Sequence, residues 1–295
     1  METLILDGKQ IAEEMRAEMT AEVKRLKAEH GLVPGLAVVL VGENPASISY
    51  VTAKQKAAEE MGIHSEEHRR SADFAEEELL KLVDQLNNDP KIHGILVQLP
   101  LPKHIDETKV LYKIDPDKDV DGFHPVNLGK LMIGEPAFLP CTPHGVQQIL
   151  VRSGFNPDGK HVVIVGRSNI VGKPVANILL QKKPGANATV TICHTGTKDL
   201  AQYTCQADIL IVAAGRPNTV NGDMVREGVV VIDVGVNRIE DASRPRGFRL
   251  VGDVDFESVK PKARAITPVP GGVGPMTITM LLYNTIESAK MRLSA

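Results

Sequence analysis

The chain has 295 residues and a formal charge of −3, with 34 basic and 37 acidic side chains and no block of one sign. It therefore lacks the basic footprint of a nucleic-acid-binding protein. Its longest apolar stretches, such as residues 36–41 and 229–232, have strand length and fall far short of the roughly 20 residues that span a bilayer. We expect neither a nucleic-acid nor a membrane partner.

Cysteine use and the N-terminus both favour a cytoplasmic location. The first ten residues, METLILDGKQ, lack a basic stretch followed by a long apolar one, so we expect no secretory signal. Cys141, Cys193 and Cys205 are odd in number and are not spaced as metal ligands, which suits a reducing compartment. We interpret all three as small buried apolar side chains and expect no metal site.

Apolar burial must come from aliphatic residues, because the chain has six Phe, four Tyr and no Trp. Buried parallel strands of α/β proteins have this aliphatic composition. Helical and strand patterns alternate along the first half of the chain, which predicts βαβ units and a parallel sheet. The predicted helices lie at residues 11–26 and 46–61 and after a capping box at Asp73 and Glu76; the predicted strands lie at 36–42 and 94–102.

Residues 115–143 are rich in Pro, Gly and Asp, and we interpret them as a connection beside a functional cleft. Thr142 as N-cap and Pro143 then predict a helix that ends near Gly154. A second series of strands is expected at 161–166, 188–194, 208–214 and 229–235. A last helix from Pro275 is expected to pack on the first domain.

Residues 162–180 read VVIVGRSNIVGKPVANILL, an imperfect dinucleotide-binding motif. Gly166 permits a tight turn, Ser168 stands where the second glycine is usual, and Gly172 comes one position late. The following helix offers amide donors to the phosphates of a dinucleotide. A plain strand-to-helix turn is the alternative interpretation.

The residues after the next strand bear on the choice between NADP and NAD. NAD-binding proteins usually place a carboxylate there for the ribose hydroxyl, but this strand ends with Cys193 and His194. Arg167 could instead face a 2′-phosphate, with His194 and Thr195 as neighbours. NADP is therefore favoured over NAD, unless Arg167 only points to solvent.

Polar residues that can carry chemistry lie in the first half of the chain. Tyr50 and Lys54 share one helix face, although an exposed helical lysine is usually a solvated one. Gln98 lies at the carboxyl end of its strand, where open α/β sheets bind ligands, or it bonds a neighbouring loop. Asp121 lies in a turn near that edge, or it caps the turn.

Two further segments contain residues that could form a binding site. Residues 266–282, ITPVPGGVGPMTITMLL, hold a constrained loop that can approach a planar ligand closely, although an interdomain turn has the same composition. His64, Glu67 and His68 match a zinc-protease pattern that requires a helix. Because Gly62 has just ended one, we reject a metal site there.

Five segments in this order resemble one family: ASISYVTAKQKAAEEMGI, VQLPLP, DVDGFHPVN, GRSNIVGKP and PVPGGVGPMT. The family is that of the bifunctional methylenetetrahydrofolate dehydrogenase and methenyltetrahydrofolate cyclohydrolase, and the similarity covers essentially the whole chain. It implies two α/β domains with a cleft between them, the second a Rossmann-like NAD(P)-binding domain with a parallel sheet. The folate-binding catalytic domain would comprise residues 1–140 plus 271–295, and the NAD(P)-binding domain residues 141–270.

The resemblance also assigns roles to residues. Lys54 matches the catalytic lysine and Gln98 the glutamine that hydrogen-bonds it, while Tyr50 matches the tyrosine that stacks on folate and Asp121 the aspartate that holds the pterin. Further substrate contacts are expected at Leu99, Pro270, Gly271 and Gly272. Cofactor contacts are expected at Gly166, Arg167, Ser168, His194, Thr195 and Val236.

The implied activity is NADP-dependent oxidation of 5,10-methylenetetrahydrofolate, followed by hydrolysis of the methenyl product to 10-formyltetrahydrofolate. Such an enzyme serves purine, methionine and histidine biosynthesis and is expected to be a homodimer. Two alternatives stay open: a monofunctional or NAD-dependent dehydrogenase of the same fold, and a non-catalytic regulator that binds a dinucleotide.

Overall fold

The structure is a computed structural model that describes residues 2–244 and 247–293. It divides into two compact units, and both are α/β, as the sequence predicts. The first unit comprises Glu14–Cys141 and the chain from Ile278 onward, and the second comprises the chain up to Glu13 and Thr142–Thr277. Within the described residues, no helix combines the length and apolarity needed to cross a membrane.

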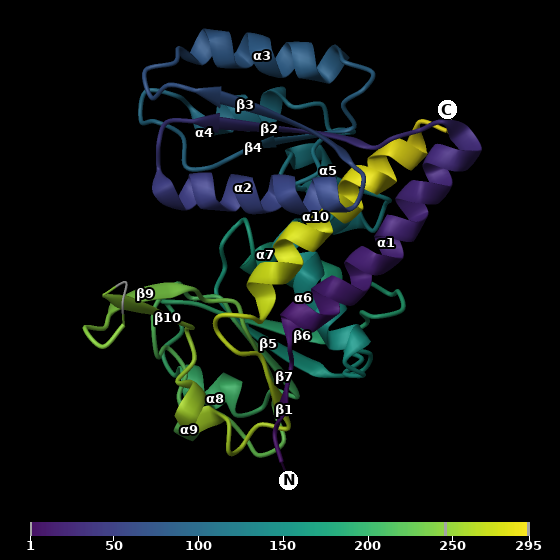
Figure 1. Ribbon diagram of the computed structural model, residues 1–295. Helices are drawn as coiled ribbons and strands as arrows, with labels where there is room; N and C mark the ends of the chain where they lie inside the picture. The colour runs from purple at the N-terminus through teal and green to yellow at the C-terminus, as the bar shows by residue number, and fades with distance from the viewer. Residues whose placement is uncertain (1, 245–246, 294–295) are drawn as a thin grey trace. The chain divides into compact units, whose positions relative to one another are not determined.

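The first unit contains a three-stranded parallel sheet in the order β3-β2-β4. Helix α3 covers one face of this sheet and α2 covers the other (Figure 1). The elements that lie wholly or mostly in this unit are α1 (Gly8–His30), β2 (Gly35–Val41), α2 (Pro45–Glu60), β3 (His64–Arg70), α3 (Glu76–Asn88), β4 (Gly94–Val97), α4 (Glu107–Lys113), α5 (Pro125–Ile133) and α10 (Val273–Met291).

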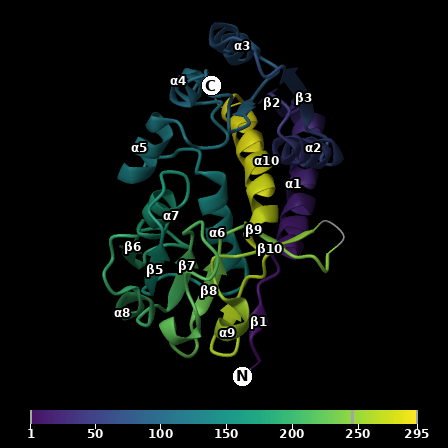
Figure 2. The same ribbon diagram turned by 90° about the vertical axis from the view of Figure 1, so that its left-hand side faces the viewer.

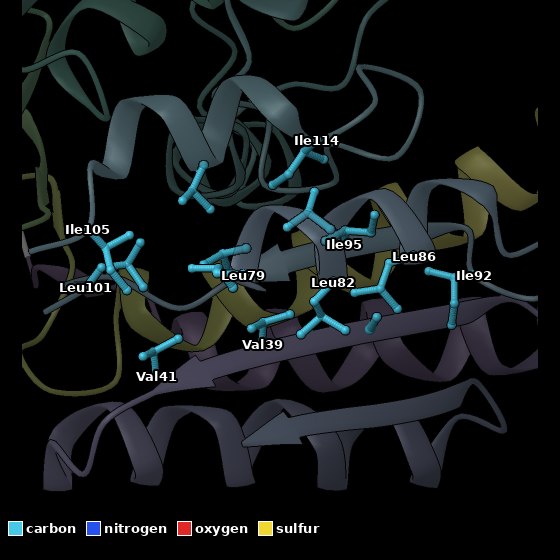
Figure 3. Close-up of a cluster of buried hydrophobic side chains, with 14 residues drawn as sticks. Val39, Val41, Leu79, Leu82, Leu86, Ile92, Ile95, Leu101, Ile105 and Ile114 are labelled. Atoms are coloured by element: carbon cyan, nitrogen blue, oxygen red, sulfur yellow. The ribbon is translucent and has the colours of Figure 1, made fainter. Parts of the chain in front are cut away.

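A buried aliphatic cluster joins the sheet to α3 (Figure 3). Val39 from β2 and Ile95 from β4 pack against Leu79 and Leu86 from α3, and all four are at most 4% exposed. Burying one such side chain stabilises the folded state by about 2 kcal/mol. Aliphatic packing therefore holds the framework, in line with the scarcity of aromatic residues.

Three local expectations for the first unit were wrong. Helix α3 has Ala75 as N-cap with no side-chain cap bond, because the Asp73 carboxylate bonds Ser71 instead. Strand β3 was missed because HSEEHRR is a polar edge strand. Helix α5 was missed within the presumed connection, although Pro125 at its start and Gly134 at its end are ordinary helix boundaries. Residues 64–70 form a strand, so they do not form the helix that the zinc-protease pattern requires. Among the described residues, no group of three or more His, Cys, Asp or Glu side chains is placed to hold a metal ion.

The second unit contains a six-stranded parallel sheet in the order β1-β11-β8-β7-β5-β6. Figure 2 shows β6, β5, β7 and β8 side by side in this order. The first residues of α1 (up to Glu13) and of α10 (up to Thr277) also belong to this unit. The elements that lie wholly or mostly in it are β1 (Leu4–Ile5), α6 (Cys141–Arg152), β5 (His161–Val165), α7 (Gly172–Leu179), β6 (Thr189–Cys193), α8 (Leu200–Thr204), β7 (Ile209–Val212), a 3-10 turn (Gly222–Met224), β8 (Val230–Asp233), β9 (Asn237–Glu240), β10 (Phe248–Val251), α9 (Phe256–Val259) and β11 (Ala265–Ile266).

The last helix docks on the first unit, as expected. From α10, Asn284 Nδ2 donates hydrogen bonds to the carbonyls of Val120 and Leu139, at 2.8 and 3.0 Å. Thr142, expected to cap α6, lies inside that helix instead, and its hydroxyl lies 2.9 Å from the hydroxyl of Thr277.

His93 is a buried imidazole at the start of β4. Its side chain is 3% exposed, and its Nδ1 accepts a hydrogen bond from the Gly35 N–H at 3.0 Å. Burial lowers the pKa of His93 to about 4. The folded chain therefore binds fewer protons at His93 than the unfolded chain between about pH 4 and the ordinary histidine pKa of about 6.5.

We predict that the free energy of unfolding falls as the pH drops from about 6.5 to 4, with up to roughly 3 kcal/mol due to His93. His93→Asn keeps an acceptor for Gly35 but cannot titrate, so its stability should fall less across this window. Urea unfolding at pH 7, 6, 5 and 4 measures the difference. An identical pH dependence in both proteins would contradict the assignment.

Candidate active site

Lys54 is a buried lysine with a hydrogen bond to a neutral amide. Helix α2 carries it, its side chain is 9% exposed, and its Nζ donates to Gln98 Oε1 at 3.0 Å. Gln98 Nε2 donates to the Leu99 carbonyl at 2.7 Å, which turns the amide oxygen toward the lysine. Lys54 is thus no solvated surface lysine, and Gln98 orients it without adding a charge.

The environment of Lys54 favours its neutral form. Burial lowers the pKa of Lys54, and electrostatic interaction with Asp121, followed by that with Cys141, only partly offsets this lowering. A lysine with a lowered pKa can both accept and donate a proton nearer to neutral pH. The pair Lys54–Gln98 is therefore suited to general acid–base chemistry.

Asp121 does not cap the turn in which it lies. Asp119 has that function, since its carboxylate accepts from the N–H groups of Gly122, Phe123 and His124 at 3.2, 3.3 and 2.7 Å. Burial raises the pKa of Asp121, while the charge of Lys54 lowers it. The turn thus presents a carboxyl group that interacts with Lys54.

Gly122 and Cys141 form part of the same arrangement. A side chain at Gly122 would meet the backbone of Leu139 and Pro140 at 2.6 to 2.8 Å, and its φ of +78° favours glycine. This close approach places Cys141 beside Asp121: the Cys141 N–H donates to the Asp121 carbonyl at 3.4 Å, and the thiol donates to the Val120 carbonyl at 3.3 Å. Burial raises the pKa of Cys141 well above its usual range.

The prediction that all three cysteines are small buried side chains was wrong. Cys141 and Cys193 are buried, but Cys205 is exposed. Cys141 also interacts electrostatically with Lys54 and Asp121. No motif pointed to Cys141, because only the packing of its segment against Gly122 brings it to this site.

Tyr50 lies one helical turn before Lys54 and is 54% exposed. A ring this accessible offers a face on which a flat ligand can stack. The first unit thus combines an aromatic surface with an acid–base pair and a carboxyl group.

The predicted dinucleotide turn follows β5 in the second unit. Gly166 has φ +136°, and a Cβ there would lie 2.2 Å from the Ala213 carbonyl oxygen. A Cβ at Gly172 would lie equally close to the carbonyl oxygen of Gly166. Ser168 Oγ accepts from the N–H groups of Val171 and Gly172, at 3.1 and 3.3 Å, and so fixes the start of α7. This tight turn, with glycine at positions 166 and 172 and the N-terminus of α7 beside it, suits the phosphates of a dinucleotide.

Arg167 and His194 meet beside this turn. The guanidinium Nη1 lies 3.5 Å from His194 Nε2, and His194 Nδ1 accepts from the Gly196 N–H at 3.0 Å. The first carboxylate after β6 is Asp199, which caps α8 through the Gln202 N–H. The donors at this edge fit a phosphate better than a ribose hydroxyl. Thr195 and Val236 are exposed near the ends of β6 and β8.

The loop of Pro270, Gly271 and Gly272 belongs to the second unit and precedes α10. The Gly271 carbonyl accepts from the Lys9 N–H at 3.1 Å. A side chain at Gly8 would lie 1.8 Å from the Gly272 oxygen, so the start of α1 holds this loop closely. Pro268, Val269 and Pro270 line a cavity of about 660 Å³ together with residues of β10. The structure thus groups Lys54, Gln98 and Asp121 in one unit, and the cofactor turn and this loop in the other.

Two α/β domains, one with an acid–base pair and one with a glycine turn for phosphates, define a class of two-domain dinucleotide-binding proteins. Residues 6–121 match the profile of the tetrahydrofolate dehydrogenase/cyclohydrolase catalytic domain, and residues 140–293 match that of the NAD(P)-binding domain of the same enzymes. The chain therefore belongs to the tetrahydrofolate dehydrogenase/cyclohydrolase family, which confirms the resemblance seen in the sequence.

Relatives match over the full length of the chain. The bifunctional protein FolD of Syntrophus aciditrophicus (strain SB) is 61% identical over 291 residues, which are 99% of both chains. The crystal structure of the bifunctional FolD from Campylobacter jejuni is 51% identical with a TM-score of 0.92, over 98% of this chain and 99% of that one. The Trypanosoma brucei enzyme, solved with NADP cofactor and inhibitor, is 41% identical with a TM-score of 0.93, over all of both chains.

We predict that Gln98→Glu raises the pKa of Lys54, because a carboxylate would replace the amide oxygen that lies 3.0 Å from Nζ. NMR titration of ¹³Cε-labelled lysines measures this, with Lys54→Met used to assign the signal. Gln85→Glu on the exposed face of α3 is the matched control and should leave the signal unchanged. A Lys54 signal that titrates at the same pH in Gln98→Glu and wild type would contradict the proposed interaction.

Proposed function

We propose that this chain oxidises 5,10-methylenetetrahydrofolate to 5,10-methenyltetrahydrofolate with NADP and then hydrolyses the product to 10-formyltetrahydrofolate. The observation that carries the proposal is the buried Lys54–Gln98 hydrogen bond, with Asp121 interacting with the same lysine. Membership in the family and full-length similarity to bifunctional relatives support both halves of the reaction. In this proposal residues 1–140 plus 271–295 serve the folate and residues 141–270 serve NADP.

The oxidation needs alignment more than acid or base. A hydride leaves the methylene carbon while the lone pair of a neighbouring folate nitrogen forms the new C=N bond, which gives the methenyl cation. NADP, when bound, supplies the hydride acceptor. The contribution of the chain is to hold the substrate: Tyr50 stacks on its rings, Asp121 binds the pterin, and Leu99, Pro270, Gly271 and Gly272 line its site.

The hydrolysis needs proton transfer, which is the role we give to Lys54. Water adds to the methenyl carbon, and the neutral amine of Lys54 takes the proton that the water loses. The resulting ammonium then protonates the ring nitrogen as its bond to that carbon breaks, and the added hydroxyl loses its proton to water as the formyl C=O bond forms. Gln98 keeps Nζ oriented in both steps, and the lowered pKa of Lys54 brings its change of charge nearer to neutral pH than that of an ordinary lysine.

For the cofactor we propose NADP in preference to NAD. The cradle of Gly166, Arg167 and Ser168 would hold the phosphates, with Arg167, His194 and Thr195 toward the 2′-phosphate and Val236 as a further contact. The Trypanosoma brucei relative was solved with NADP, which supports this choice. The guanidinium of Arg167, close to His194, supports it independently.

One assay separates this proposal from its alternatives. The purified chain is given methylenetetrahydrofolate with NADP or NAD, and reduced nicotinamide and decay of the methenyl absorbance are followed separately. We expect both signals with NADP. Reduction without decay of added methenyltetrahydrofolate indicates a monofunctional dehydrogenase, and preference for NAD corrects the cofactor. The absence of both signals leaves the non-catalytic regulator.

We also propose that the chain acts as a cytoplasmic homodimer that serves purine, methionine and histidine biosynthesis. The three free cysteines suit a reducing compartment. Strand β3 is an edge of its sheet, and the Ser65 hydroxyl in it is buried without a hydrogen-bond partner among the described residues. Such an edge suits contact with a second copy, and light scattering of the purified chain gives the oligomeric state.

We predict that Lys54→Met abolishes methenyl hydrolysis while the variant still binds folate, because Met fills similar volume but moves no proton. Hydrolysis is followed by the decay of methenyl absorbance, and binding by calorimetry with methenyltetrahydrofolate. Lys56→Met, an exposed lysine of the same helix, should hydrolyse as the wild type does. Full hydrolase activity in Lys54→Met would refute the role of Lys54.

We predict that Arg167→Ala raises the KM for NADP roughly tenfold or more and changes the KM for NAD little, since a lost hydrogen bond to a charged group costs about 1.5 to 3 kcal/mol. Steady-state kinetics with both cofactors measure the ratio. The matched control is Lys173→Ala, since Lys173 is a cation of the same segment that donates to Asn169 at 2.7 Å. An equal rise in both KM values would show that Arg167 does not select the 2′-phosphate.

A further inference from the structure

Two buried aspartates lie at the carboxyl edge of the six-stranded sheet, apart from the acid–base pair. Asp233 ends β8 and is 4% exposed, and Asp253 follows β10 and is 0% exposed. Neither residue belongs to the family segments singled out in the sequence. Their hydrogen bonds show what they hold in place.

Asp253 ties together the turns that follow two neighbouring strands. Its Oδ2 accepts from the N–H groups of Ala214 and Gly215 at 2.6 and 2.8 Å, in the turn after β7. Its Oδ1 accepts from Asn237 Nδ2 at 2.8 Å, beyond the end of β8. One carboxylate thus fixes the position of two turns at the edge where open parallel sheets bind ligands.

Asp233 in turn holds the backbone of Asp253. Its Oδ1 accepts from the N–H groups of Gly235 and Asp253 at 3.0 and 2.9 Å, and its Oδ2 accepts from the Val254 N–H at 2.9 Å. A Cβ at Gly252 would lie 1.7 Å from Asp233 Oδ2, and one at Gly235 would lie 2.2 Å from Asp253 Oδ1. These two glycines therefore allow both carboxylates to reach the backbone.

The two carboxylates are held by dipoles and not by counter-charges. Every hydrogen bond that the described residues make to them comes from a neutral N–H group. Burial raises the pKa of Asp233 to about 6, so at pH 7 it is still mainly ionised. Hydrogen bonds to an ionised acceptor are shorter and stronger than neutral ones. The turns are consequently held more firmly than neutral side chains would hold them.

The turns so held adjoin the proposed cofactor contacts. Ala213, next to Ala214, is the residue whose carbonyl oxygen would lie 2.2 Å from a Cβ at Gly166. Val236, an exposed proposed contact, lies between Gly235 and Asn237, which bond Asp233 and Asp253 respectively. A shift of Asp253 would therefore move backbone beside the phosphate cradle and beside Val236 together.

We propose that Asp253, anchored by Asp233, is a positioning residue for NADP, which fixes the turns at Ala214–Gly215 and Gly235–Asn237 for cofactor binding. The inference rests on the proposed NADP-dependent reaction and adds to it two residues that act through the turns they hold. Methenyl hydrolysis needs no NADP. Methenyl hydrolysis by the same chain is therefore an internal control. A variant that only misplaces the cofactor should keep this activity.

The test is Asp253→Asn, which keeps the size of the side chain but leaves one acceptor oxygen where the carboxylate has two. Calorimetry with NADP should show a Kd raised by about tenfold or more, the effect of losing a charge-assisted hydrogen bond. The KM for NADP should rise more than kcat falls. Hydrolysis of methenyltetrahydrofolate without NADP should stay within about twofold of wild type, because this step does not use the cofactor. A twofold change in rate corresponds to less than one RT of activation free energy.

Asp255→Asn is the matched control. Asp255 lies two residues further on, and its side chain makes no cap bond to α9, so this variant should bind NADP as the wild type does. Asn237→Ala removes one partner of Asp253 without touching the buried carboxylate. It should weaken NADP binding several-fold with hydrolysis intact, and it keeps the inference testable if Asp253→Asn does not fold.

The outcomes separate the inference from the proposed function. A wild-type chain that neither binds nor reduces NADP refutes the proposed function. If the wild type does both, unchanged NADP affinity in Asp253→Asn and Asn237→Ala overturns the positioning role. Equal loss of NADP binding and methenyl hydrolysis in Asn237→Ala also overturns it, since that result indicates a purely structural role.

Discussion

The burial of the Lys54 ammonium against a neutral amide is the constraint on which the first unit depends. Removing a lysine from water favours its neutral form, and Gln98 supplies a hydrogen bond without the charge that would reverse this effect. The bond requires α2 and the end of β4 to keep one spacing. The aliphatic cluster around α3 and the hydrogen bonds of Asn284 to the segments of Val120 and Leu139 hold that framework.

The second unit also buries ionisable groups against neutral partners, but there the groups are carboxylates. Asp233 and Asp253 are buried with N–H donors as their partners, and Asp119 in the first unit organises its turn in the same way. A buried carboxylate that accepts several amide bonds fixes backbone geometry more tightly than a solvated ion pair does, because each bond is directional and water does not compete. Turns in both units, among them those proposed to bind ligands, are therefore held by buried carboxylates with neutral N–H partners.

Elements with strong aliphatic patterns were predictable, and polar or short ones were not. The buried strands β2, β5, β7 and β8 agree with the predicted ones, whereas β4 begins where predicted but ends at Val97, short of the predicted end at residue 102. Strand β3 was missed because all its side chains are polar and none is fully buried, and α5 because its Pro- and Gly-rich flanks look like a connection. Asp73 fits the capping-box pattern, but its carboxylate bonds Ser71. A sequence pattern alone does not decide which of several nearby partners a side chain bonds. The aspartate at the end of β8 was visible as a charge ending an apolar run, yet its partners come from a distant segment.

The sequence by itself determined the fold class, the two-domain organisation in outline and the family, because periodicity and contiguous motifs are local properties of the chain. It also placed Tyr50 and Lys54 on one helix face. Only the tertiary structure decided that Lys54 is buried against Gln98, that Asp119 and not Asp121 caps the turn, and that Cys141 lies beside Asp121. The burial of Lys54 and the position of Cys141 depend on desolvation and on contacts between residues 20 to 44 positions apart, which no local pattern contains. The cap of the turn is a local contact, but both aspartates fit its pattern, and only the folded backbone selects Asp119.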